Sequence, residues 1–173
     1  MTQPIAFSTK EIRKLGKVDG YKSRQKVLEA ELRTLGADRY DLLLPETHAL
    51  PLLLQNEERL LGIVCGRYKQ TENDAQGRGA LVATNSRVLL IDKKPLYMRY
   101  EELPYYNISA ITYSRVGPSG VVTLYSRVGS INIHTLNQTC AQIFVRAIEE
   151  HILVPGVNQQ QTQLSFPGST PIH

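Results

Sequence analysis

The sequence predicts an α+β protein in which seven antiparallel strands form a bent sheet or open barrel, with a C-terminal helix closing it and a helical section preceding it. Apolar, β-branched runs recur at short spacing between residues 59 and 136, separated by turn-forming residues. After residue 136 the apolar period changes from two to three or four, which is typical of a helix. The segment before residue 54 also has the helical period.

The N-terminal section is predicted to contain two helices. The first, in DGYKSRQKVLEAELRTLGA, has Asp19 or Ser23 as its N-cap and ends at Gly36. Its apolar stripe comprises Tyr21, Leu28, Leu32 and Leu35. A second, shorter helix is predicted to include residues 46–58, although we expect Pro51 to fit only in its first turn.

The β section follows as a series of short apolar runs. The predicted strands are Arg59–Lys69, Arg78–Thr84, Arg87–Lys93, Leu96–Leu103, Ile108–Val116, Gly120–Val128 and Ser130–Leu136. Their connections are of hairpin length, whereas parallel crossovers need a dozen or more residues. An antiparallel meander is therefore expected. The alternation of apolar and polar residues in several strands predicts that one face of the sheet is buried and the other is exposed to solvent.

The connection TNSR between the second and third strands is predicted to be structural. Asn85 tolerates left-handed geometry, and the hydroxyls of Thr84 and Ser86 are placed to bond nearby backbone groups. Arg87 then begins the next strand. We therefore interpret this motif as a fold signature rather than an active site.

The C-terminal helix is predicted to start after an N-cap at Asn137 and to stop at Pro155. Its apolar stripe consists of Ala141, Phe144, Ile148 and Ile152. Residues 155–173 carry no charge and no periodicity, so a flexible tail is expected. The sequence therefore divides into three predicted parts. Residues 1–53 form the helical section, residues 54–154 form the β domain with its C-terminal helix, and residues 155–173 form the tail.

Composition restricts the compartment and the chemistry. Cys65 and Cys140 show no clustering, which indicates reduced, packed thiols. No signal peptide and no apolar run of about 20 residues is seen, so we expect a cytoplasmic protein without a transmembrane segment. The four histidines are scattered, and the paired glutamates are adjacent in sequence. We therefore predict no catalytic residue, no metal and no cofactor.

The phrase GALVATNSRVLLIDKK, with the strand order and the helix after it, resembles the bacterial pleckstrin-homology (PH)-like domains. The YokE-like group is most similar, and the GRAM domains are similar at a greater distance. NEERLLGIV and YYNISAI also fit the pattern of that group, and the resemblance covers about residues 54–153. It implies a seven-stranded PH-like barrel capped by a C-terminal helix, serving as a binding domain.

The resemblance also implies candidate binding residues. Eukaryotic relatives often bind phosphoinositide headgroups through bases on the first hairpin, and the corresponding residues here are Arg67, Lys69 and Arg78. The position two beyond Arg78 is Ala80, so the headgroup motif is incomplete. Two more bases, at the end of the third strand, complete the candidate set of Arg67, Lys69, Arg78, Lys93 and Lys94. We expect a ligand at the barrel end lined by the loops 69–78, 93–97 and 117–120.

Two functions are consistent with these residues. The first is a non-enzymatic binding or assembly module that works through protein contacts, including self-association, because the N-terminal leucine stripe needs a partner surface. The alternative is peripheral binding to anionic lipid, since Lys and Arg exceed Asp and Glu by four and the excess lies within residues 59–154. Tyrosines interleaved with bases also suit ordinary sheet surfaces, so nucleic-acid binding is not expected.

Overall fold

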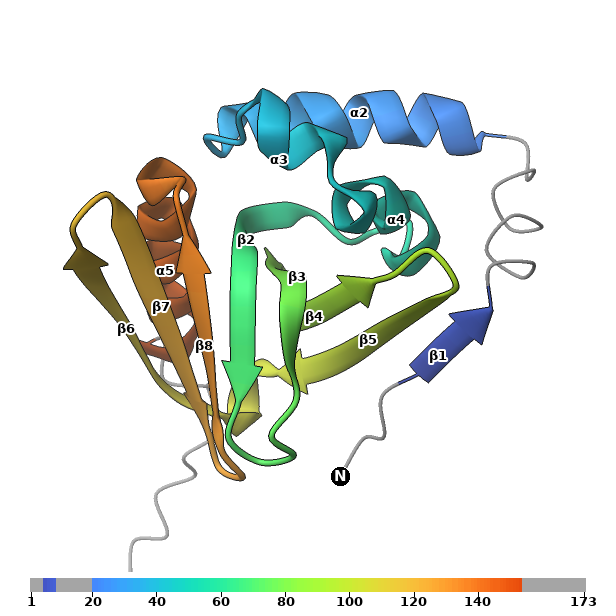
Figure 1. Ribbon diagram of the computed structural model, residues 1–173. Helices are drawn as coiled ribbons and strands as arrows, with labels where there is room; N and C mark the ends of the chain where they lie inside the picture. The colour runs from blue at the N-terminus through green and yellow to red at the C-terminus, as the bar shows by residue number, and fades with distance from the viewer. Residues whose placement is uncertain (1–4, 9–19, 154–173) are drawn as a thin grey trace, which may run out of the picture.

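The structure is a computed structural model that describes residues 5–8 and 20–153 (Figure 1). The predicted tail, residues 155–173, and the proposed cap Asp19 lie outside this part of the chain. The helices are α2 (Tyr21–Thr34), α3 (Arg39–Leu43), α4 (Pro45–Leu53) and α5 (Gln138–Leu153), with a 3₁₀ turn η1 (Tyr105–Asn107). The strands are β1 (Ile5–Ser8), β2 (Leu60–Gln70), β3 (Gln76–Thr84), β4 (Arg87–Lys93), β5 (Tyr97–Pro104), β6 (Ile108–Val116), β7 (Ser119–Ser126) and β8 (Ser130–Thr135).

The seven predicted strands are confirmed as β2 to β8, all paired antiparallel. An eighth strand, β1, was not predicted, and it joins the sheet by pairing with β5 from Ile5–Tyr100 to Ser8–Tyr97. The spatial order is β1-β5-β4-β3-β2-β8-β7-β6. A four-residue segment is too short to show a period of its own, so the available edge of β5 decides its structure.

The inner face of the sheet encloses the main core, which α5 covers. Phe144 and Ile148 are fully buried against Val64, Leu81 and Ile133 of the strands. The predicted N-cap is confirmed, because Asn137 Oδ1 accepts a hydrogen bond from the backbone N–H of Cys140 at 3.1 Å. A Cβ on Gly62 would lie only 2.7 Å from the Cα of Phe144, so the backbones of β2 and α5 approach each other closely at that point.

The three N-terminal helices pack on the outer face of β2, β3 and β4 (Figure 1). Leu28 and Leu32 of the α2 stripe share a buried cluster with Ile63, Val82 and Leu89. The stripe that the sequence left without a partner is thus covered by the chain's own sheet, and it needs no second molecule.

Two predictions about these helices were wrong. The α2 N-cap is Gly20, which has a positive φ of 95° and makes no side-chain cap bond, whereas Ser23 lies within the helix. The predicted second helix corresponds to α4, which ends at Leu53 rather than near residue 58, and Pro51 lies inside it, beyond its first turn. Helix α3 was not predicted. Because α4 is short, the missing N–H of Pro51 removes only one backbone hydrogen bond, and the burial of the Pro51 ring compensates for that loss.

The TNSR turn has the structural role that the sequence predicted, although its geometry differs. Thr84 Oγ1 accepts the backbone N–H groups of Ser86 and Arg87 at 3.2 and 3.1 Å and donates to Glu58 Oε1 at 2.8 Å. Asn85 does not adopt left-handed geometry, since Asp74 is the one non-glycine residue with positive φ in the described part of the chain. Asn85 instead accepts the Arg59 N–H through Oδ1 at 2.9 Å, which fixes the turn to the start of β2.

Arg87, the last residue of the TNSR motif, forms a buried ion pair beneath the turn. Its Nε lies 2.8 Å from Glu58 Oε1 and its Nη2 lies 2.9 Å from Glu58 Oε2, while Nη1 contacts Glu102. Burial tends to raise the pKa of Glu58, but the bonds from Arg87 and neighbouring donors outweigh it and hold that pKa at about 2. The motif therefore joins the chain before β2 to the β3–β4 turn.

Candidate functional site

Three basic side chains form a row across adjacent strands on the outer face of the sheet. Arg67 of β2 pairs directly with Arg78 of β3 on one side and with His134 of β8 on the other. Residues paired in this way have Cβ atoms about 4.5–5.5 Å apart, and like charges directly opposite are destabilising. We call Arg67, Arg78 and His134 the basic row, and all three side chains are exposed.

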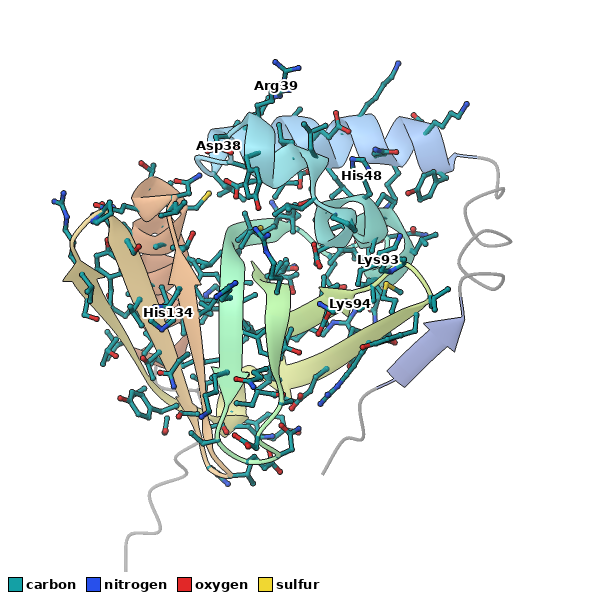
Figure 2. The ribbon with its side chains drawn as sticks, viewed as in Figure 1. Asp38, Arg39, His48, Lys93, Lys94 and His134 are labelled. Carbon is teal, nitrogen blue, oxygen red and sulfur yellow. The ribbon has the colours of Figure 1, made fainter. Side chains whose placement is uncertain are left out.

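The five bases proposed from the sequence divide into two groups. Arg67, Lys69 and Arg78 lie together, since Arg67 and Lys69 are two residues apart on one face of β2 and Arg67 faces Arg78. Lys93 and Lys94 lie at the end of β4, on the other side of β2 and β3 from His134 (Figure 2). Lys94 Nζ pairs with Asp92 Oδ1 at 2.7 Å and contacts the Arg78 carbonyl at 3.2 Å, so its charge is already neutralised.

Two hollows of about 450 and 420 Å³ meet over the basic row, because all three of its residues line both. The first continues towards α3 and the end of β8, where Tyr40 and Leu136 line it. The second continues towards the β2–β3 loop, where Lys69 and Gln76 line it. We call the joined hollows the basic groove, with its Tyr40–Leu136 end and its Lys69 end.

Helix α3 forms the wall at the Tyr40–Leu136 end. A capping box fixes the helix, since Asp38 Oδ1 accepts the Asp41 N–H at 2.9 Å and Asp41 Oδ2 accepts the Asp38 N–H at 3.2 Å. Asn137 donates to the same Asp41 oxygen at 2.6 Å, which ties α3 to the start of α5. The guanidinium of Arg78 donates to the Tyr40 hydroxyl, so the wall also orients one member of the basic row.

The groups beneath this end are poorly suited to nucleophilic chemistry. Cys65 and Cys140 are free and buried, as predicted. Burial, followed by the charge of Asp41, raises the pKa of the Cys140 thiol to about 12 and raises that of Cys65 as well. Burial also raises the pKa of Asp41. In the described part of the chain, no three metal-ligating side chains come together.

The prediction that the loops 69–78, 93–97 and 117–120 line one end of the barrel was partly wrong. Thr71 N–H bonds the Ser130 carbonyl at 3.0 Å, so the β2–β3 loop lies beside the β7–β8 turn. Gly120 pairs with Thr135 at the opposite end, which removes the loop 117–120 from the set. Strict alternation would make the first and seventh strands of a meander parallel. Because β2 and β8 pair antiparallel, the chain must break that alternation at the β5–β6 corner.

Sequence reasoning missed His134 and Tyr40. Both are remote in sequence from the first hairpin, and strand register and helix packing alone bring them to Arg67 and Arg78. A lone histidine in an alternating strand carried no signal for this. Its position opposite Arg67 depends on the pairing of β8 with β2, which the sequence did not indicate.

Comparison with known proteins identifies the fold family. The family model described as "Bacterial PH domain" matches residues 54–150, which span β2 to β8 and most of α5. The chain belongs to the bacterial PH domain family. The resemblance to bacterial PH-like domains is thereby confirmed, and helices α2 to α4 lie outside the matched part of this bacterial PH domain. No curated protein matches the chain.

Solved structures similar to this bacterial PH domain include other PH domains. The Vps36 N-terminal PH domain has 16% identity and a TM-score of 0.40, covering 57% of this chain and 82% of that one. The C-terminal domain of an unknown protein from Leishmania infantum has 17% identity and a TM-score of 0.44, covering 61% and 92%. The linker-DH/PH domains of p115-RhoGEF have 12% identity and a TM-score of 0.38, covering 76% and 39%.

Within residues 5–8 and 20–153, no helix has both the length and the apolar character that a span requires.

Proposed function

We propose that this bacterial PH domain is a non-enzymatic binding module that holds an acidic partner in the basic groove. The observation that carries the proposal is the direct pairing of Arg67 with Arg78. Among the described residues, no carboxylate forms an ion pair with either guanidinium. Two exposed, unneutralised like charges held side by side repel each other, and a bound anion would convert that repulsion into attraction.

Three further features of the site are consistent with an anionic partner. The guanidinium of Arg78 is already oriented by the Tyr40 hydroxyl, so less side-chain freedom is lost when a ligand binds. The groove volume lies within the range of ordinary ligand sites. The nearest competing charge at the Lys69 end is Asp74, which pairs with Lys69 at 3.6 Å while both side chains are exposed. Such an exposed ion pair contributes little to stability, and a bound anion readily displaces Asp74 from Lys69.

The test is charge reversal within the basic row. We expect Arg67→Glu together with Arg78→Glu to weaken binding of fluorescent poly-L-glutamate about tenfold or more at low salt, because two attractions become repulsions. The matched control is Lys22→Glu with Lys26→Glu, which makes the same charge change on the exposed side of α2. Fluorescence anisotropy with the full chain measures both variants. Equal losses in the two variants would mean that net charge alone, and not the groove, governs binding.

Self-association is a second candidate function. The leucine stripe of α2 is already covered by the sheet, so the surface that supports self-association is instead a free edge of the sheet. β6 ends the sheet and pairs only with β7 among the described strands. An uncovered edge strand offers backbone groups to a second copy. If β6 edges pair, Arg115→Pro should abolish a concentration-dependent dimer, because the register with β7 directs the Arg115 N–H to the free edge, where proline removes it and obstructs pairing. Light scattering measures this, with Arg115→Ala as control, and a wild-type chain that stays monomeric at high micromolar concentration contradicts it.

A further inference from the structure

The two bases on β2 have the spacing of side chains on an extended peptide. Arg67 and Lys69 lie two residues apart on one face of the strand, which places them about 6.5–7 Å apart along its axis. Any extended segment lying along β2 repeats its own side chains on one side at the same interval. Two acidic residues separated by one residue would therefore meet Arg67 and Lys69 in turn, and Arg78 would share the first of them.

The basic groove is elongated rather than compact. Its lining runs along β2 from Cys65 to Lys69, which corresponds to about 13 Å at the rise of a strand. This length accommodates an extended segment of four or five residues. A single phosphate-sized anion would occupy only the middle, at Arg67 and Arg78, and would leave both ends empty.

The two ends of the groove have different chemistry. At the Tyr40–Leu136 end, Leu136 is 79% exposed and Tyr40 is 55% exposed, so an apolar side chain would find two apolar surfaces there. The exposed carboxylate of Asp38 lines the same end and would repel an acid. At the other end, Lys69 favours an acid. The groove therefore distinguishes the two directions of an acidic segment.

We propose that the occupant of the basic groove is an extended segment of a partner protein in which one apolar and two acidic residues alternate with small residues. The apolar residue lies against Tyr40 and Leu136, the first acid binds Arg67 and Arg78, and the second binds Lys69. This assignment rests on the proposed function, because it specifies the acidic partner of the same groove.

A flat anionic bilayer fits the same charges less well. The β2–β3 loop continues directly from Lys69 and carries the exposed acids Glu72 and Asp74. A bilayer that reaches Lys69 would also approach both carboxylates, whereas a narrow peptide that ends at Lys69 has to displace only Asp74 from its exposed ion pair with that lysine. The charge arrangement therefore favours a protein segment over a lipid surface.

The test compares two peptides of identical composition, acetyl-Gly-Leu-Ser-Glu-Ser-Glu-Gly-amide and acetyl-Gly-Leu-Ser-Ser-Glu-Glu-Gly-amide, labelled for fluorescence anisotropy with the full chain. We expect the alternating peptide to bind at least about fivefold more tightly, since only its two acids face the sheet together. Lys69→Glu should remove this preference. Leu136→Ser, which leaves the bond between Arg78 and Tyr40 intact, should weaken the alternating peptide but leave unchanged a version in which Leu is replaced by Ser. Lys22→Glu with Lys26→Glu serves as the charge control.

Two further probes separate failure of this inference from failure of the proposed function. They are inorganic pyrophosphate and vesicles of phosphatidylcholine with 30 mol% phosphatidylserine. Equal affinity for the two peptides overturns the inference. If pyrophosphate or vesicles bind in a manner that depends on Arg67 and Arg78 while neither peptide binds, the inference is also wrong and the proposed function stands. If none of the probes binds, both are wrong.

Discussion

Arg87→Met is expected to lower the free energy of unfolding by about 3–5 kcal/mol. Arg87 supplies two hydrogen bonds to Glu58, whose side chain is only 2% exposed. Methionine fills much of the space but leaves the carboxylate buried without its counter-ion, and that uncompensated charge is the source of the large effect. Urea denaturation followed by circular dichroism measures the change.

Two further variants decide whether the ion pair is responsible. Arg115→Met removes an exposed arginine from β6 and should change stability by less than about 0.5 kcal/mol. Glu58→Gln combined with Arg87→Met should cost clearly less than the sum of the single changes, because each single change leaves an unpaired group that the double change removes. Additive losses would contradict the account of a coupled buried pair.

The same pair predicts how stability depends on pH. The pKa of Glu58 is about 2 in the folded chain and near its ordinary value of 4.5 when the chain is unfolded. The unfolded state therefore binds the proton more readily at acid pH. The contribution of Glu58 is complete above pH 4.5 and is lost as the pH falls towards 2, and Glu58→Gln should flatten that part of the stability curve.

Gly66→Ala is expected to destabilise the fold by about 3 kcal/mol or more and to abolish binding in the basic groove. An ideal Cβ on Gly66 would lie 1.8 Å from the carbonyl oxygen of His134, a backbone atom that no side-chain rotation can move. β2 and β8 would have to separate beside the pair of Arg67 with His134, so the row would lose its register. Thermal unfolding and anisotropy with poly-L-glutamate measure the two effects.

The matched control is Gly117→Ala in the β6–β7 turn. A Cβ there meets no atom within 4 Å, and the cost is confined to the positive φ of 59°. We expect about 1–2 kcal/mol from that backbone strain and unchanged binding. If Gly66→Ala behaves like Gly117→Ala, the close approach of β2 to β8 is not what holds the row together.

Much of the fold could be predicted because it depends on local signals. Alternating apolar runs and hairpin-length connections located β2 to β8, and the helical period with Asn137 as cap located α5. The TNSR motif was correctly interpreted as structural, since short hydroxyl side chains at a turn bond its backbone. The partner beneath the turn, Glu58, lies 29 residues from Arg87 and left no local signal.

The failures share a different cause, which is dependence on contacts between distant segments. β1 exists as a strand beside the edge of β5, and the position of the loop 117–120 depends on how β8 closes against β2. The residues of the candidate site also divide into those that local sequence identified and those that only distant contacts bring together. Arg67, Lys69 and Arg78 share one hairpin and were found together, whereas His134 and Tyr40 join them only through register and packing.

The most direct measurement of the central claim is a nuclear magnetic resonance titration of the full chain with the alternating acidic peptide. If the basic groove is the binding site, the guanidinium Nε–H signals of Arg67 and Arg78, the His134 ring and the Lys69 amide shift together and saturably. Signals of Arg115, Arg127 and the α5 residue Arg146 should stay in place. Saturable shifts confined to α5 or to the β7–β8 turn, with the basic row unaffected, would contradict the claim.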